Sequence, residues 1–364
     1  MSLPRRSRGR RGVAAPLAAA AAAVALLAGA PGARADTTLR VYSAGGGDFS
    51  SVQAALDSVA DPAAAGRLTL LLAGVFRERV TVGARFTAGV DVVGTAPGGP
   101  LANFIVFNRS GSGGAACAPT GGGGTFDSWT LRVDAADVRL AGVAVANDAC
   151  GYDHKAAGQS VALHVTGDRV AVFDSRLLGS QDTLYTGGAR TYYARTFING
   201  TVDALFGEGA AVWDACELVH NTTVTAHKGG VLPAAAGGGP TAYLLRDCSV
   251  DAYPGGRVVL GRPWGPTATV VWLNASLSSR VDRAGWDDWS HNCTAAPAHD
   301  RARTWCANVT YAEAASRGPG GAPGGRVWWS QQLDAAGAAA WTAARVLGAW
   351  QPAPPPAWLA RARA

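Results

Sequence analysis

Short runs of apolar residues, each opened by an aromatic residue and a small or polar pair, recur through the middle of the chain. Three of them begin 20 residues apart, at FDSRLL (173–178), YARTFI (193–198) and WDACEL (213–218). The apolar positions between them show no helical periodicity. A repeat of this length without a helical pattern predicts a stacked β-solenoid in which each repeat forms one coil.

The same frame continues on both sides of this region with wider spacings. LAGVAV (140–145) begins 33 residues before the first repeat, and LRDCSV (245–250) and WLNASL (272–277) follow at intervals of 32 and 27. We interpret the wider spacings as longer loops on one face of the coil. Near-continuous apolar runs at residues 68–73 and 90–94 predict further strands with neighbours on both sides.

Both ends of the predicted solenoid carry helical signals. Residues 36–60 predict a first strand, a turn and a short amphipathic helix with Ser50 or Ser51 as its N-cap. Such a helix would cover the open strand edges of the first coil. At the other end, the Ala-rich stretch Gln331–Val346 is helix-like, and Pro352–Pro356 ends it.

The first 35 residues differ from the rest of the chain. Five arginines between Arg5 and Arg11 precede an Ala/Leu/Val run, and Ala33–Ala35 offers a small-x-small cleavage site. This pattern predicts a signal peptide and export, and the apolar run is short for a membrane span. We therefore expect a signal peptide at 1–35, one solenoid domain at 36–350 and a Pro/Ala/Arg-rich tail at 351–364, with no membrane contact after cleavage.

Composition and charge agree with a loop-rich exported protein. The 48 glycines and 19 prolines suit many tight corners and argue against a helical fold. The predicted signal peptide holds six of the 32 basic side chains and none of the 26 acidic ones, so the remainder carries 26 of each. Bulk charge therefore argues against capture of nucleic acid or another strong polyanion, and favours a weakly charged polymer.

The chain has six cysteines, an even number in an export context, which predicts disulfides. Cys216 and Cys248 occupy the same place in two repeats, so they should lie on neighbouring strands within disulfide reach. Cys293 and Cys306 bracket one loop. The expected pairs are therefore 216–248, 293–306 and, for the remaining two, Cys117 with Cys150; buried free thiols are the alternative. No CxxC or clustered histidines indicate a metal site.

Six Asn-x-Ser/Thr sequons predict N-linked glycans in a secreted eukaryotic chain: Asn108, Asn199, Asn221, Asn274, Asn292 and Asn308. Asn199 is the doubtful one, because it lies four residues before Asp203.

Polar residues interrupt the apolar pattern at nearly equal intervals. Gln159 and Gln181 are 22 residues apart, and Asp182 and Asp203 are 21 apart. Residues at equal places in neighbouring coils lie one strand spacing apart, roughly 4.8 Å, so these side chains should form a column. Two carboxylates that close are costly unless one is protonated or both are used in chemistry. Solenoid turns favour Asp and Gln in any case, so a structural role stays open on spacing alone.

The blocks around these residues resemble, in order and spacing, the signature blocks of pectin methylesterases, carbohydrate esterases of plant and microbial cell-wall metabolism. These blocks are GQSVAL (158–163), GSQDTLY (179–185), GTVDALFG (200–207) and LGRPW (260–264). Further agreement covers residues 45–59, 73–80, 311–321 and 326–330. The resemblance implies an all-β fold, a single-stranded right-handed parallel β-helix, and hydrolysis of the methyl esters of pectin by a secreted or cell-wall enzyme without a cofactor. We expect a monomer.

The resemblance also implies roles for individual residues. Asp203 matches the nucleophile and Asp182 the general acid/base, while Gln159 and Gln181 match the donors to the oxyanion. Arg262 matches the arginine that holds the nucleophile ionised and oriented, and Trp264 matches a wall on which a sugar stacks. These residue types suit ester hydrolysis, which needs a nucleophile, a proton carrier for the alcohol and donors for the tetrahedral oxyanion.

Some residues depart from the family's pattern. Ala204 and Leu205 stand where bulky or aromatic residues are usual, which suggests a wider cleft floor. Glu208 replaces a customary Asn and adds a negative charge near Asp203. Residues 226–230, AHKGG, replace another usual block. These departures put the substrate pattern in doubt more than the type of reaction.

Two other functions stay open on the sequence. A polygalacturonase-like glycoside hydrolase would also use two carboxylates about 5 Å apart, although the two glutamines would have no obvious task in it. The other is a non-catalytic pectin-binding wall protein. His164 alternates with apolar residues in VALHV and is interpreted as a core or corner residue rather than a catalytic one.

Overall fold

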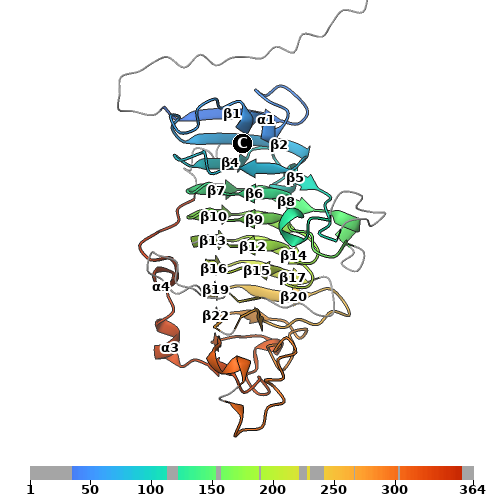
Figure 1. Cartoon of the computed structure of the whole chain (residues 1–364), viewed down its shortest axis with the longest axis vertical. Coiled ribbons are helices and arrows are strands. Elements are labelled where there is room, and N and C mark those ends of the chain that lie inside the picture. The colour runs from blue at the N-terminus through green and yellow to red at the C-terminus, as the bar shows by residue number, and fades with distance from the viewer. Residues whose placement is uncertain are drawn as a thin grey trace, which may run out of the picture. The chain divides into compact units, whose positions relative to one another are not determined.

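The sequence repeats fold into coils whose strands stack in parallel, one coil below the next (Figure 1). In the computed structural model, the described residues are 35–112, 122–152, 157–187, 190–220, 228–229, 242–265, 267–301 and 304–354. The predicted signal peptide, apart from Ala35, lies outside these residues, as does most of the predicted tail. No helix within the described ranges has the length and apolar character needed to cross a membrane.

Three ladders of parallel strands form the walls of the coils. The first ladder contains β1 (Thr37–Tyr42), β2 (Leu68–Arg77), β4 (Val90–Gly94), β7 (Val138–Ala141), β10 (Val170–Phe173), β13 (Arg190–Ala194), β16 (Ala210–Asp214), β19 (Tyr243–Arg246), β22 (Thr269–Leu273), β24 (Thr310–Ala314) and β25 (Ser330–Gln332). The second continues from the end of β2 through β5 (Asn103–Phe107), β8 (Ala144–Asn147), β11 (Arg176–Leu178), β14 (Phe197–Gly200), β17 (Glu217–His220), β20 (Ser249–Ala252) and β23 (Ser276–Leu277). The third contains β3 (Val80–Val82), β6 (Leu131–Val133), β9 (Leu163–Val165), β12 (Leu184–Thr186) and β15 (Leu205–Phe206).

Short elements complete the chain. A separate pair joins β18 (Lys228–Gly229) to β21 (Arg262–Pro263). The α-helices within the described residues are α1 (Val52–Asp57), α3 (Ala335–Ala339) and α4 (Ala343–Leu347). Single 3₁₀ turns are η1 (Pro100–Ala102), η2 (Thr125–Asp127), η3 (Ala149–Tyr152), η5 (Trp305–Asn308) and η6 (Pro319–Gly321). These elements confirm the predicted all-β parallel β-helix with short helical segments at both ends.

The repeats recognised in the sequence mark the sharp turn from the first ladder to the second. One residue in each of these turns is in the left-handed region, with φ between +48° and +56° at Asp174, Arg195, Ala215, Asp247, Asn274 and Ala315. The residue after it is small and buried, as at Ser175, Cys216 and Ala275. A left-handed residue bends the chain sharply within one step, and only a small side chain fits inside the corner.

The register confirms most of the predicted frame. Tyr193 pairs with Trp213, Trp213 with Leu245 and Leu245 with Trp272, as the repeats predicted. The first frame is wrong by one residue, because Phe173 pairs with Ala194 rather than with Tyr193. The left-handed residue is second in FDSRLL and third in YARTFI. Since Asp, Arg and Ala all occupy this position, the sequence letters alone do not locate it.

Inward-facing residues of the first ladder form a continuous column through the core. Register places Leu70, Val92, Leu140, Val172, Tyr193, Trp213, Leu245 and Trp272 one above another. All of them are buried, and the Tyr193 and Trp213 rings stack with centroids 5.1 Å apart. Below Trp272 the column continues with Glu313, a buried acid that pairs with Arg326 at 2.8 Å, and then with Gln332 of β25. In-register stacking therefore brings like side chains together over many coils.

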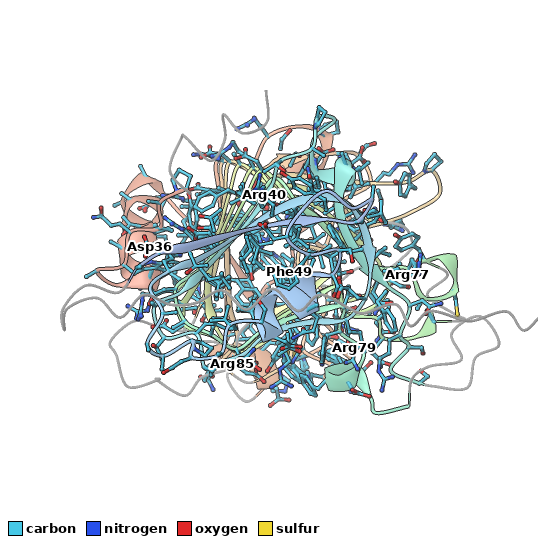
Figure 2. All side chains as sticks on the ribbon, turned by 90° about the horizontal axis from the view of Figure 1, so that it is seen from above. Asp36, Arg40, Phe49, Arg77, Arg79 and Arg85 are labelled. Carbon is cyan, nitrogen blue, oxygen red and sulfur yellow. A yellow bond between two sulfur atoms is a disulfide. The ribbon has the colours of Figure 1, made fainter. Side chains whose placement is uncertain are left out.

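Helix α1 covers the first coil, as predicted. The Ser51 hydroxyl caps it by accepting from the Ala54 N–H, and Val52, Ala55 and Leu56 face the core. The Glu78 carboxylate accepts from the Val52 N–H at 2.7 Å and satisfies another free amide of the first turn. In Figure 2, which views this end from above, Phe49 lies near the centre of the coil and the labelled arginines lie around it.

The C-terminal segment lies against the outer face of the first ladder. Val346 and Leu347 of α4 pack on Val212, Leu244 and Val271, which point outward from their strands. The predicted helical stretch 331–346 is thus divided between the end of β25, α3 and α4. The outward residues are apolar because this segment covers them.

One predicted disulfide is confirmed and another is wrong. Cys293 and Cys306 are bonded, with Cα atoms 5.9 Å apart. Cys150 is also disulfide-bonded, while its predicted partner Cys117 lies outside the described residues. Cys216 and Cys248 are free buried thiols. They do lie on neighbouring coils and interact with each other, but no disulfide joins them, and the thiols donate to backbone carbonyls, Cys216 to Tyr193 and Asp214 and Cys248 to Trp213 and Arg246.

The sequons separate by exposure. Asn274, Asn292 and Asn308 are exposed, whereas Asn199 is 8% exposed and its side-chain amide donates to the Val219 carbonyl at 2.8 Å. The structure therefore gives Asn199 a role in the ladder that leaves it poorly accessible for glycosylation.

Candidate active site

The two aspartates lie in the turns that lead into the third ladder. Leu184 of β12 pairs with Leu205 of β15, and the Asp182 N–H donates to the Val202 carbonyl at 2.9 Å. This register places Asp182 opposite Asp203 on the next coil. Both have positive φ, +61° and +51°, which Asp adopts more readily than most residues. Both are almost fully buried, at 3% and 1% exposed.

The two glutamines form a second column directly beside the aspartates. Gln159 and Gln181 form an isolated parallel bridge, and the Ser160 N–H donates to the Gln181 carbonyl at 2.8 Å. Both side chains are half-buried. The predicted grouping is present over three coils, with Gln159 on the first, Gln181 and Asp182 on the second and Asp203 on the third, but the amides and the acids stand in two adjacent columns instead of one.

Arg262 joins the aspartate column from a distant part of the chain. Its Nε donates to Oδ1 of Asp203 at 3.0 Å and its Nη2 donates to Oδ2 at 2.9 Å, a bidentate ion pair. Arg262 lies on strand β21, which pairs with β18. Strand β18 belongs to the block 226–230 that departs from the family pattern. Trp264 is half-buried two residues further along.

Two contacts at the site were missed from the sequence. The Trp289 ring lies against the Arg262 guanidinium, whose carbon is 4.0 Å from the ring centroid. Trp289 has φ +51°, unusual for a bulky residue, and its N–H donates to the Asp287 side chain at 2.8 Å. The Thr125 hydroxyl makes a long hydrogen bond of 3.4 Å to Asp182 Oδ2. The pair Trp286 and Trp289 in GWDDW was a signal that could have pointed to the first contact.

Aromatic rings line the outward face of the third ladder beside the aspartates. His164, Tyr185 and Phe206 follow one another in register, with centroids 4.6 Å and 5.0 Å apart. Phe126 packs edge-on against His164 and Tyr185 and is 50% exposed. Burial lowers the pKa of His164 to about 4, and the nearby Arg132 lowers it further. His164 is 4% exposed, which confirms that it belongs to the packing.

The departures from the family pattern have distinct positions. Ala204 and Leu205 are fully buried, and Leu205 belongs to the core, so their size affects the packing beneath the site. Glu208 accepts a hydrogen bond from the Tyr185 hydroxyl at 2.9 Å. Burial, with the Glu208 charge second, raises the pKa of Tyr185 well above its usual range, so this hydroxyl stays protonated.

The site can supply the groups that acyl transfer requires. A carboxylate fixed by a guanidinium can act as a nucleophile, a second carboxyl group can carry a proton, and two carboxamides can donate to an oxyanion. Within the described ranges, no cluster of His, Cys, Asp and Glu has the arrangement of a metal site.

Solved structures of pectin methylesterases have the same fold as this chain. Pectin methylesterase from carrot matches with a TM-score of 0.68 and 23% identity, covering 85% of this chain and 92% of that one. Pectin methylesterase PemA from Erwinia chrysanthemi matches with a TM-score of 0.65 and 24% identity, covering 89% and 100%. These likenesses show that the chain shares the parallel β-helix fold of those structures.

Sequence comparison is more specific. Pectinesterase 31 of Arabidopsis thaliana is 29% identical over 300 residues, which are 81% of this chain and 87% of that protein. Pectinesterase QRT1 of the same plant is 26% identical over 292 residues, covering 79% and 71%. The pectinesterase family model matches residues 38–349. The chain belongs to the pectinesterase family.

Proposed function

We propose that this protein is secreted and hydrolyses the methyl esters of polygalacturonate, with Asp203 as nucleophile and Asp182 as acid/base. The observation that carries the assignment is the bidentate hold of the Arg262 guanidinium on Asp203, which stacks beside Asp182. Arg262 donates to both carboxylate oxygens of Asp203, and the Thr125 hydroxyl makes a long hydrogen bond to Asp182. An arginine fork favours the ionised form of its carboxylate, and a nearby negative charge favours the protonated form of a second carboxyl group.

The reaction then divides into two steps. The ionised Asp203 carboxylate attacks the ester carbonyl carbon, while carboxamide N–H groups of Gln159 and Gln181 donate to the oxygen that becomes negative. Collapse of this intermediate expels methanol, which takes a proton from Asp182, and leaves an acyl–Asp203 intermediate. Asp182, now ionised, removes a proton from water, which attacks the acyl group and regenerates Asp203.

The rest of the site suits a chain of weakly charged sugars. Trp264 and the exposed ring of Phe126 offer apolar faces on which pyranose rings stack. The equal numbers of acidic and basic residues outside 1–35 favour a largely esterified polymer over a densely charged one. We expect the enzyme to act as a monomer on cell-wall pectin.

Methanol release from esterified pectin by the purified chain tests the proposal. Asp203→Asn and Asp182→Asn should each lower kcat by at least about 10³-fold, because each removes a group that takes part in the chemistry. Asparagine is the suitable replacement since it adopts positive φ as readily as aspartate. The exposed Asp251, far along the chain on β20, provides the matched control, and Asp251→Asn should release methanol at the parent rate.

Chain length of the product separates the other functions. A polygalacturonase-like hydrolase would shorten pectin and lower its viscosity without releasing methanol. A pectin-binding protein would retain pectin and release nothing, and its binding would survive Asp203→Asn. Parent-like methanol release by either site variant would remove the mechanism.

A further inference from the structure

We propose that Glu208 makes the site select esterified galacturonate over free galacturonate at the sugar position beside Tyr185. This inference rests on the proposed function and specifies which neighbours of the scissile ester the site accepts. It arises from one carboxylate, held by Tyr185, on the same face as the aspartate column.

Tyr185 connects Glu208 to the site. Leu184 and Thr186 on either side of Tyr185 are fully buried, so alternation along β12 directs the Tyr185 ring outward. The ring packs between His164 and Phe206 and meets Phe126 edge-on with centroids 5.1 Å apart. Thr125, the neighbour of Phe126, reaches Asp182. One loop therefore touches both the proposed acid and the ring whose hydroxyl donates to Glu208.

The geometry of this contact fixes the Glu208 carboxylate at the surface of the ladder. The Tyr185 hydroxyl donates to Oε2 of Glu208 at 2.9 Å, and Glu208 is half-buried. Gly207 before it has φ +128° and would bring an added Cβ to 2.4 Å from the Thr186 carbonyl oxygen. The turn that presents Glu208 is therefore tightly packed against β12, and its position is defined by the backbone.

The charge of Glu208 is not neutralised by a partner among the described side chains. Asp203 pairs with Arg262 and Asp134 pairs with Arg132 on this face, but no arginine, lysine or histidine that the structure describes forms an ion pair with Glu208. A carboxylate is ionised at neutral pH, and the Tyr185 hydroxyl that faces it is neutral. Among the side chains that the structure describes, Glu208 is therefore a negative charge beside the aromatic column without a basic ion-pair partner.

Free and esterified galacturonate differ in this environment. A free galacturonate carboxylate within a Debye length of Glu208 is repelled, whereas a methyl ester carries no charge and meets no such barrier. At separations of several ångströms near a protein surface, this repulsion amounts to about threefold to tenfold in kcat/KM. The enzyme should then favour esters flanked by esters and slow down as its own product accumulates.

The test compares methanol release from two pectins of equal chain length, one highly and one sparsely esterified, by the purified full chain. Glu208→Gln should lower the ratio of kcat/KM on the two substrates about threefold to tenfold, mainly by raising kcat/KM on the sparsely esterified pectin. Added salt should lower the parent's ratio in the same direction and leave that of Glu208→Gln nearly unchanged. Glu217→Gln, an exposed glutamate on β17 of the second ladder, is the control and should keep the parent ratio.

The outcomes separate the two proposals. Methanol release with an unchanged ratio in Glu208→Gln overturns the inference and leaves the proposed function intact. A parent that releases no methanol from either pectin overturns both. If Glu208→Gln does not fold, as judged by its thermal unfolding, the salt dependence of the parent's ratio decides, and a ratio that salt does not change refutes the selection.

Discussion

Replacing Arg262 by methionine deprives a buried carboxylate of its bidentate partner. Asp203 is 1% exposed and Arg262 is 16% exposed, with both hydrogen bonds near 3 Å. Removing one partner of such a buried pair costs about 3–5 kcal/mol, since the remaining charge keeps its desolvation penalty. We therefore expect the free energy of unfolding of Arg262→Met to fall by about 3–5 kcal/mol. Methanol release should fall by about 10²-fold or more, because the carboxylate loses its fixed orientation.

A double-mutant cycle measured by urea unfolding isolates this interaction. Asp203→Asn alone leaves the guanidinium without its acid, and the double variant removes both charges, so it should be more stable than Arg262→Met. Arg262→Lys keeps the charge but loses the planar fork, and we expect an intermediate result for both stability and activity.

An exposed ion pair provides the control for this cycle. Arg257 pairs with Asp282, but its side chain is 67% exposed, so Arg257→Met should cost at most about 1 kcal/mol. If Arg262→Met loses no more stability than Arg257→Met and releases methanol at the parent rate, the pair with Asp203 has neither of the roles argued above.

Two further predictions concern residues that the sequence did not assign to catalysis. The pKa of His164 is about 4 in the folded chain and 6.5 when unperturbed, so the unfolded state binds a proton at higher pH than the folded state does. The contribution of neutral His164 to the free energy of unfolding is therefore complete above about pH 6.5. About 3 kcal/mol of it is lost as the pH falls to about 4. His164→Phe should flatten this part of the curve of unfolding free energy against pH. His299→Phe is the control, because that side chain is 79% exposed, and it should leave the curve unchanged. Equal slopes in the parent and in His164→Phe would contradict the burial argument. Trp289→Leu removes the ring against Arg262 and should lower kcat by about tenfold while Trp289→Phe restores most of it; a change in KM alone would mean that Trp289 contacts sugar instead of positioning Arg262.

Periodicity in the sequence predicted the relative positions of most site residues, because coils of nearly equal length stack in register. The intervals from Gln159 to Gln181 and from Asp182 to Asp203 are each one coil, so counting residues was enough to bring the four side chains together on three successive coils. The same counting placed Phe173 opposite the wrong residue. The left-handed position of the corner accepts Asp, Arg or Ala, so no single residue type identifies the corner in the sequence.

Counting residues could not predict contacts that are made through long loops. Arg262 is 59 residues from Asp203, and Trp289 lies still further along, so the contacts Asp203–Arg262–Trp289 depend on how loops outside the ladders return to the third ladder. The Arg262 role was inferred from resemblance, and the Trp289 contact was not inferred at all. The hydrogen bond between Tyr185 and Glu208 could not be predicted from the sequence either, although Glu208 was recognised as a departure from the family pattern.

The amino-acid sequence by itself determined that this chain forms a stacked β-solenoid and that two acids and two amides meet on three successive coils, because both follow from the repeat length. Tertiary structure alone decided the contacts that depend on direction as well as position. Cys216 and Cys248 lie on neighbouring coils as predicted, yet their thiols point at backbone carbonyls and stay unbonded. Arg262 engages Asp203 and Tyr185 engages Glu208 because side-chain direction and loop path, which no spacing encodes, bring those atoms together.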